Sequence, residues 1–247
     1  MIVGAGFAGL TAAIECVRKG HSALLLESFA VLKPLGDIIS FGSNAGRIFH
    51  QWPGVEEKLD PICHNSKFLR FNTYNGEHVF DQYWDEEKVY GKRYNGHRGE
   101  IHEILFNYAK EVGVEIRLGQ RVTEYFETDH EAGVICNGEK IVADVILAAD
   151  GVRSTARTIV LGFEDRPKSS GYAIYRAWMS SEELAKNPLT KDLVIHGDSH
   201  TGWLGPDIHF LAAAITETKS FSWVCTHTVS ISIAQLIHMS LHSVGRP

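Results

Sequence analysis

A glycine-rich turn close to the first residue constrains the fold of this chain more than any other part of its sequence. Gly4, Gly6 and Gly9 are spaced as G-x-G-x-x-G and directly follow the apolar pair Ile2 and Val3. In such a turn the first glycine permits a tight bend, the second lets the backbone approach a phosphate, and the third lets a helix pack on a strand. We therefore expect a strand, a phosphate-binding turn and a helix, in this order.

The residues after the turn complete a β-α-β unit. Apolar residues recur at helical spacing over 10–17, Gly20 ends that pattern, and the apolar run over 23–26 predicts a strand buried on both faces. Glu27 closes this second strand about 20 residues beyond the turn, where an acidic side chain binds ribose hydroxyls. A glycine turn that arose by chance would lack the strand before it, the helix after it and the acidic residue at this distance. The acidic residue favours an unphosphorylated adenosine ribose, as in NAD or FAD, over NADP, and does not separate the first two.

The composition narrows the partners that such a chain can have. With 44% hydrophobic and 22% charged residues, its 247 residues are typical of an ordinary globular protein and long enough for one large domain or two modest ones. The formal net charge of −6 gives no basic surface, so neither nucleic acid nor an anionic membrane is an expected partner. The apolar stretch over 229–241 is too short for a transmembrane segment.

Cysteine and histidine usage argues against a metal site. The four cysteines are scattered without a C-x-x-C pair, and the 13 histidines contain no H-E-x-x-H motif. We therefore expect no metal ligands, and free thiols in a reducing compartment. The first apolar run leads straight into the glycine turn rather than into a signal peptide, which predicts a cytoplasmic protein.

The rest of the chain predicts further elements in two sheets. We expect an amphipathic helix after Arg98 and a second buried strand over 144–149. Four short strands are expected between them, over 114–118, 122–126, 133–136 and 140–142. The last two are joined by Asn137-Gly138, a strong hairpin signal.

Beyond residue 165 the pattern changes to strands of a different sheet. We expect these strands over 171–178, 193–196, 209–215 and 221–226. The predicted class is α/β: a Rossmann-type domain over 1–165, with a parallel sheet, helices and a small antiparallel layer, then a partial mixed-sheet substrate domain over 166–227. Residues 228–247 are predicted to be a divergent tail.

Three further segments carry a resemblance to a known family. The stretch over 36–45 contains Gly-Asp-Ile-Ile and Ser-Asn-Ala, His97-Arg98 precedes the predicted helix, and the stretch over 144–154 ends in Asp-Gly-Val-Arg-Ser. Together with the glycine turn and Glu27, these segments resemble the flavoprotein monooxygenases of the salicylate hydroxylase and kynurenine monooxygenase type. The resemblance covers residues 1 to 157 and extends, through 40–45 and 175–178, to a fungal secondary-metabolite subgroup that includes enzymes oxidising prenylated indole alkaloids.

The resemblance implies an oxidoreductase with FAD as its cofactor and NAD(P)H and O2 as co-substrates. Such an enzyme hydroxylates or epoxidises an aromatic or indole-type small molecule, here in alkaloid-like secondary metabolism. Its cofactor performs the redox and oxygen chemistry, and the protein binds and orients the cofactor. Arg176 is the candidate catalytic or substrate-orienting residue. The residues implied to bind FAD are Gly4, Gly6, Gly9, Glu27, Gly36, Arg98, Asp150 and Gly151.

Several of these residues also have simpler structural explanations. Asp150 ends a predicted parallel strand, where ligands gather, but an aspartate there also suits a helix cap. Arg98 at a helix start is unfavourable beside the helix dipole unless a phosphate binds there. Arg176 is equally compatible with a solvated arginine on a half-exposed strand.

Two other features allow both a functional and a structural interpretation. Trp178, Trp203 and Phe210 are candidates for an aromatic pocket, although such residues more often belong to a core. Gly197-Asp198 resembles the G-D-A-A-H motif of the family, whose aspartate contacts the flavin, but its surroundings indicate a hairpin turn.

The chain departs from the family pattern at both ends. It starts inside the first predicted strand, and no Gly-Asp motif followed by a proline and a glycine pair occurs after Cys225. We therefore expect an incomplete flavin site, weak FAD retention and low or absent turnover. Two other hypotheses stay open: an inactive monooxygenase fragment, and an NAD-dependent dehydrogenase, against which Arg98 and Asp150-Gly151 argue. The substrate, the choice between NADH and NADPH and the oligomeric state do not follow from the sequence.

Overall fold

The structure, a computed structural model, describes residues 1–32, 36–85 and 87–229 and divides them into two compact units. The first unit comprises residues 1–63 and 87–167, and the second comprises residues 64–85 and 168–229. The two units share no sheet and each has a hydrophobic core, so each is described by itself.

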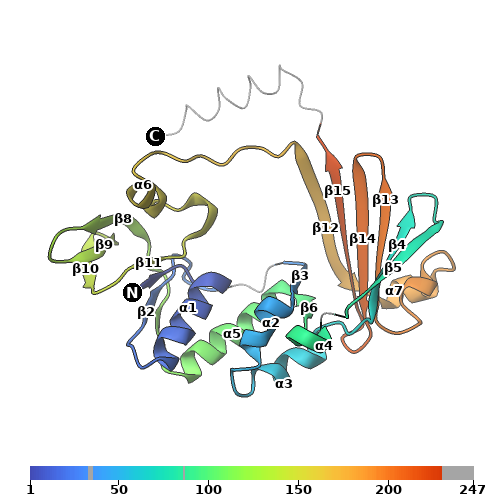
Figure 1. Ribbon diagram of the computed structural model, residues 1–247, viewed down its shortest axis with the longest axis horizontal. Coiled ribbons are helices and arrows are strands. Elements are labelled where there is room, and N and C mark those ends of the chain that lie inside the picture. The colour runs from blue at the N-terminus through green and yellow to red at the C-terminus, as the bar shows by residue number, and fades with distance from the viewer. Residues whose placement is uncertain (33–35, 86, 230–247) are drawn as a thin grey trace. The chain divides into compact units, whose positions relative to one another are not determined.

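The first unit is built on a four-stranded parallel sheet (Figure 1). Its strands, in spatial order, are β11 (Leu147–Ala148), β1 (Ile2–Val3), β2 (Leu24–Leu26) and β7 (Glu115–Arg117). The helices α1 (Phe7–Arg18) and α5 (Arg98–Glu111) lie side by side next to this sheet. The predicted α/β class with a parallel sheet, helices and antiparallel layers is confirmed.

The core of this unit forms where apolar residues at helical spacing meet the sheet. Leu10 and Ile14 of α1, Leu25 of β2, and Ile101 and Leu105 of α5 are all fully buried at 0% exposure. Burial of such a side chain stabilises the fold by roughly 1.5–3 kcal/mol. The helical stripes read from the sequence therefore mark the faces that hold the two helices in place.

Two antiparallel sheets complete the strands of the first unit. One pairs β3 (Ile38–Phe41) with β6 (Tyr94–His97), and the other joins β8 (Val122–Glu127), β9 (Ala132–Cys136) and β10 (Glu139–Ala143). Asn137 (φ +50°) and Gly138 (φ +85°) turn between β9 and β10, which gives the predicted hairpin the two positive φ angles of a type I′ turn. Short helices fill the connections: α2 (Ser43–Phe49), α3 (Val55–Leu59), η1 (Asp60–Ile62), α4 (Glu87–Tyr90), η2 (Gly151–Arg153) and α6 (Ala156–Leu161).

The second unit is a six-stranded sheet whose strands come from two separate parts of the chain (Figure 1). Its spatial order is β12 (Tyr172–Ser180), β15 (Ser220–Thr228), β14 (Ile208–Ile215), β13 (Ser199–Gly205), β4 (Phe68–Thr73) and β5 (His78–Tyr83). The short helices α7 (Glu182–Lys186) and η3 (Lys191–Leu193) belong to the same unit. Strands β4 and β5 lie within the 1–165 range expected for the first domain, but β4 pairs in parallel with β13 and so belongs to this sheet. The boundaries expected at 165, 227 and 247 otherwise stay predictions, and 230–247 lie outside the described residues.

Two local expectations are wrong. The strand expected over 193–196 is instead the end of η3 and a loop, because Leu193 and Val194 pack, partly buried, against the sheet rather than pairing in it, and β13 begins only at Ser199. The strand expected to be buried over 144–149 is the two-residue edge strand β11, in which Leu147 is 39% exposed. An edge strand has only one neighbour, which here is β1, so its side chains are less covered.

Candidate functional site

Two of the three turn glycines are required by the packing of the turn itself. Gly4 has φ +102°, and a Cβ on it would lie 2.4 Å from the carbonyl oxygen of Ala149. A Cβ on Gly9 would lie 1.8 Å from the carbonyl oxygen of Gly4. These distances leave no room for any side chain, so the turn packs directly against the end of β11 and against α1.

Gly6 has a different role, because nothing lies within 4 Å of the position where its Cβ would be. It is exposed and precedes α1 as its N-cap, with φ −70°. The first hydrogen bond inside α1 runs from the N–H of Leu10 to the carbonyl of Gly6 at 2.9 Å. The N–H groups of residues 6–9 are therefore the donors left over at the helix N-terminus, where the helix dipole favours an anion. No acidic residue occupies the first turn of α1 to compete for this position.

Glu27 is buried at the end of β2 and bonds to the glycine turn. Its Oε2 accepts the N–H of Ala5 at 2.8 Å, and its Oε1 accepts the N–H of Phe29 at 2.9 Å and the hydroxyl of Ser28 at 3.0 Å. A carboxylate has about four lone-pair sites, so these bonds leave capacity for a further donor such as a ribose hydroxyl. Glu27 therefore shapes the turn as well as facing the cavity beside it.

A cavity of about 410 Å³ lies at the carboxyl ends of the parallel strands, and we call it the carboxyl-end cavity. Its lining brings together Gly4, Gly6, Glu27, Asp150 and Gly151, five of the residues implied by the sequence. Ligands of open α/β sheets bind in this position. The cavity offers backbone N–H groups at its glycine turn and a carboxylate at its rim, and these fit a diphosphate and a ribose. The residues present thus fit the adenosine diphosphate part of FAD.

Asp150 is held by a tyrosine that the sequence analysis did not single out. Oδ2 of Asp150 accepts a hydrogen bond of 2.9 Å from the hydroxyl of Tyr125, whose side chain is buried in β8. Burial, and then the hydrogen bond to Asp150, raise the pKa of Tyr125. The alternative of a helix cap is wrong, because Asp150 precedes η2 without a side-chain capping bond. Gly151 follows with φ +84°, a conformation that favours glycine.

Gly36 and Arg98 lie together, outside the lining of the carboxyl-end cavity, although they are 62 positions apart in the sequence. Pairing of β3 with β6 brings them close: a Cβ on Gly36 would lie 2.9 Å from Cβ of Arg98, and the N–H of Arg98 donates to the carbonyl of Asp37 at 2.8 Å. The guanidinium of Arg98 lies 5.6 Å from the ring centroid of Phe7, the first residue of α1. Arg98 is thus placed next to the glycine turn through Phe7.

His102, one turn further along α5, also reaches the glycine turn and was missed by the sequence analysis. Its Nε2 lies 2.6 Å from the carbonyl oxygen of Ala5. The signal in the sequence was its position four residues after Arg98, on the same face of the helix.

Arg176, the candidate catalytic residue, lies in the second unit and is exposed on β12, opposite Val224 of β15. Side chains alternate between the faces of a sheet. Register therefore places Arg176 and Trp178 on one face, and Trp203 and Phe210 on the other. The single aromatic pocket considered for the three aromatic residues is therefore wrong, and Trp203 and Phe210 pack in the core beneath α7 and η3. Whether Arg176 serves catalysis stays a prediction.

Gly197-Asp198 forms a bend, as its surroundings indicated, but not between two strands. Oδ2 of Asp198 accepts the N–H of Asn65, and Oδ1 accepts the N–H of Thr216, both at 2.7 Å. Asp198 therefore fastens the start of β13 to the segments that precede β4 and follow β14.

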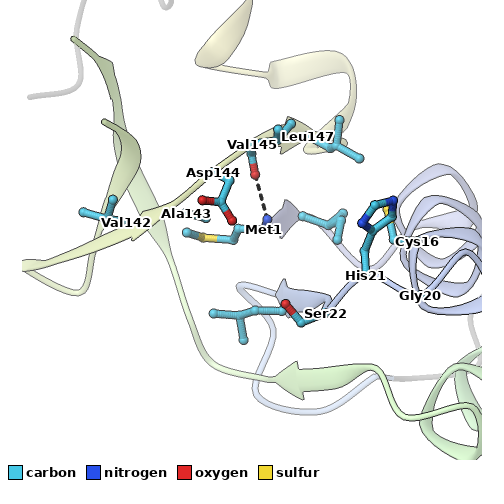
Figure 2. A pocket seen from close by; sticks show the side chains of 12 residues that line it. Met1, Cys16, Gly20, His21, Ser22, Val142, Ala143, Asp144, Val145 and Leu147 are labelled. Atoms are coloured by element: carbon cyan, nitrogen blue, oxygen red, sulfur yellow. Dashed lines mark hydrogen bonds between the residues drawn. The ribbon is translucent and has the colours of Figure 1, made fainter. Parts of the chain in front are cut away.

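A second cavity in the first unit, of about 730 Å³, lies at the amino ends of the parallel strands (Figure 2). The α-amino group of Met1 donates to the carbonyl of Val145 at 2.7 Å there, and burial lowers the pKa of that amino group. His21, Cys16 and Asp144 also line this space. Because ligands of such sheets bind at the carboxyl ends, the smaller carboxyl-end cavity is the candidate nucleotide site.

Comparison with known proteins assigns the chain to a family. A family model described as an FAD binding domain matches residues 1–204, and the chain belongs to this family. Its expected cofactor is therefore FAD, as the sequence predicted.

The relatives narrow the class further. The chain is 38% identical over 237 residues to an asperlicin C monooxygenase of Petromyces alliaceus, covering 92% of this chain and 50% of the relative. It is 36% identical over 232 residues to a notoamide E oxidase of Aspergillus versicolor, covering 91% and 50%. The predicted resemblance to fungal FAD-dependent monooxygenases is confirmed. The chain spans about half the length of these curated relatives.

Solved structures agree with this assignment. A crystal structure of CtdE with FAD and its substrate 4 has a TM-score of 0.86 and 35% identity, covering 94% of this chain and 57% of that one. A salicylate hydroxylase substrate complex has a TM-score of 0.74 at 21% identity, over 94% and 56% of the two chains, and shares the fold. In the described ranges, no helix has both the length and the apolar character needed to cross a membrane.

Proposed function

We propose that this chain acts as an FAD-dependent monooxygenase that uses NAD(P)H and O2 to hydroxylate or epoxidise an aromatic or indole-type small molecule in secondary metabolism. The main support for this proposal is the carboxyl-end cavity. Three parallel strands end there, next to a glycine turn that is suited to bind a diphosphate. The family match supports FAD, and the names of the relatives support oxygen insertion into a fungal metabolite. A cytoplasmic location remains our prediction.

The residues of the cavity would divide the binding of the cofactor among them. The N–H groups at the start of α1 would bind the diphosphate, with Gly6 leaving room for it, and Glu27 would accept hydrogen bonds from the adenosine ribose. Asp150 and Gly151, held by Tyr125 at the end of β11, would contact the cofactor further along. When bound, FAD supplies the redox chemistry, in which NAD(P)H provides two electrons, one atom of O2 enters the substrate and the other leaves as water.

The test is to purify the chain, add FAD and follow its spectrum, then supply NADH or NADPH with indole-type compounds under 18O2. A product that gains one 18O atom, with NAD(P)H consumed in proportion, supports the proposal. NAD(P)H consumption that yields only hydrogen peroxide would contradict it and favour an FAD-binding protein without oxygenase activity. Reduction of NAD+ by a substrate, with no dependence on flavin, would instead favour a dehydrogenase. A tightly held, stoichiometric flavin would overturn the expected weak retention.

We also propose that Arg176 orients the substrate. It is exposed on β12, on the opposite sheet face from Trp203 and Phe210, so a ligand bound on that face would lie beside its guanidinium. Arg176→Ala is expected to raise KM or lower kcat, whereas Lys219→Ala, which removes an exposed partner of Glu182, is expected to do neither. Equal kinetics for Arg176→Ala and the unmodified chain would exclude this role.

A further inference from the structure

We propose that His102 is a positioning residue for the phosphate-binding turn: it holds the carbonyl of Ala5 and thereby aims the N–H of Gly6 at the diphosphate of FAD. The inference rests on the proposed assignment of this turn to FAD. None of the motifs on which the resemblance was based includes His102, and only the tertiary contact points to it.

The contact itself is short and one-directional. Nε2 of His102 lies 2.6 Å from the carbonyl oxygen of Ala5. A carbonyl oxygen can only accept, so Nε2 carries the hydrogen and donates it. Ala5 is 2% exposed, so water has little access to this residue and the histidine satisfies a carbonyl that would otherwise be costly to bury.

The peptide group on the other side of Ala5 is held as well. The N–H of Ala5 donates to Oε2 of Glu27 at 2.8 Å. This N–H is therefore committed to Glu27, and the next donor along the turn is the N–H of Gly6. Glu27 and His102 together restrain both peptide planes that flank Ala5.

Because a peptide group is planar, holding the carbonyl of Ala5 also fixes the direction of the N–H of Gly6. The bond between Ala5 and Gly6 is trans, so the Ala5 carbonyl and the Gly6 N–H point in opposite directions within one plane. The carbonyl points to His102 on α5, and the N–H consequently points away from α5. Gly6 lines the carboxyl-end cavity, with open space where its Cβ would be. The N–H that an anion needs is thus oriented before any ligand binds, which lowers the entropic cost of binding.

The imidazole ring is itself held on two sides. Phe7 meets it edge-on, with ring centroids 5.5 Å apart, and Phe106 stacks against it at 6.5 Å with an interplanar angle of 15°. Phe106 is buried in α5, and Phe7 lies under the guanidinium of Arg98. The position of the ring therefore depends on the packing of α5 against α1, and small rotations of the ring are resisted.

The experiment measures binding of FAD, and of ADP as a diphosphate probe, by fluorescence titration and calorimetry on the full chain. His102→Phe keeps a ring between Phe7 and Phe106 but lacks the donor, and His102→Gln keeps an N–H donor. Glu103→Gln changes the exposed neighbour of His102 on α5 and is the matched control. Gly6→Ala tests the turn assignment separately. Melting curves of each apoprotein show whether the fold is retained.

We expect His102→Phe to weaken both ligands about tenfold, the size of one lost hydrogen bond. His102→Gln is expected to stay within about threefold of the unmodified chain, because the donor is kept. Glu103→Gln should leave both affinities unchanged. The inference would be overturned if a folded His102→Gln bound the ligands as weakly as His102→Phe, or if His102→Phe kept the affinity of the unmodified chain.

The variants separate this inference from the proposed function. If Gly6→Ala weakens FAD while His102→Phe does not, the turn binds the diphosphate and only the role of His102 is wrong. If Gly6→Ala binds FAD and ADP as tightly as the unmodified chain, or if the unmodified chain binds neither ligand, the turn assignment is wrong and the inference falls with it.

Discussion

The hydroxyl of Tyr125 donates a 2.9 Å hydrogen bond to Oδ2 of Asp150 and so ties the small antiparallel sheet to the end of β11. Removing the hydroxyl by Tyr125→Phe leaves the partly buried carboxylate without this donor, which costs roughly 0.5–1.5 kcal/mol, the net contribution of one hydrogen bond. We expect a lower free energy of unfolding in urea and weaker FAD binding. Tyr83→Phe, at an exposed position on β5, is the control and should change neither quantity. Full stability in Tyr125→Phe would show that the bond contributes nothing.

The glycines of the turn should separate binding from folding. Gly6→Ala places a methyl group in open space and is expected to change the free energy of unfolding by less than about 1 kcal/mol. The methyl group enters the space proposed for the diphosphate, so FAD affinity should fall tenfold or more, roughly the loss of one to two hydrogen bonds.

Gly9→Ala is the opposite case. Its methyl group would lie 1.8 Å from the carbonyl oxygen of Gly4, so the turn must shift before the chain can fold. Such overpacking costs about 1–3 kcal/mol or more. Thermal denaturation of the apoprotein should show a clear drop in Tm, and an unchanged Tm would contradict the packing at this turn.

The buried thiol of Cys63 should make the protein sensitive to alkali. Burial raises the pKa of Cys63 to about 12, so the folded state keeps the proton after the unfolded state has lost it. The stability from this difference is fully present below about pH 9 and is lost as pH rises towards 12, by at most about 1.4 kcal/mol per pH unit. Cys63→Ala should therefore show a shallower decline in urea unfolding between pH 9 and 11. The half-buried Cys225→Ala serves as the control, and parallel declines in all three proteins would exclude this cause.

Asp198 should stabilise the second unit without affecting the cofactor. Both of its carboxylate oxygens accept backbone N–H groups, from Asn65 and Thr216. Asp198→Ala is expected to cost about 1–3 kcal/mol in the free energy of unfolding, because two backbone donors lose their acceptor. FAD affinity should stay as it was, and a loss of affinity in a folded variant would restore the flavin-contact interpretation of this motif. Asp192→Ala, at an exposed side chain near His196, is the control.

The parts of the fold that depend on short-range patterns were predictable. The glycine spacing, the helical stripe after Arg98 and the Asn137-Gly138 turn each act within a few residues, and each formed where expected. The strand expected over 193–196 is wrong because Leu193 and Val194 have the apolar character of a strand, but they pack, partly buried, against the core of the second unit without joining a sheet. A short apolar run predicts burial, but it does not distinguish a strand from a loop that packs on a sheet.

By itself, the sequence determined the β-α-β unit with its glycine turn and Glu27, because local periodicity and backbone freedom are properties of neighbouring residues. Only the tertiary structure decided which side chains hold that turn. His102 meets Ala5 across 97 residues, Tyr125 meets Asp150 across 25, and β4 joins β13 from a separate part of the chain. Such contacts depend on how whole helices and strands pack. The hydrophobic effect that drives this packing is non-directional, so the apolar pattern of a sequence predicts which residues are buried but not which residues they contact.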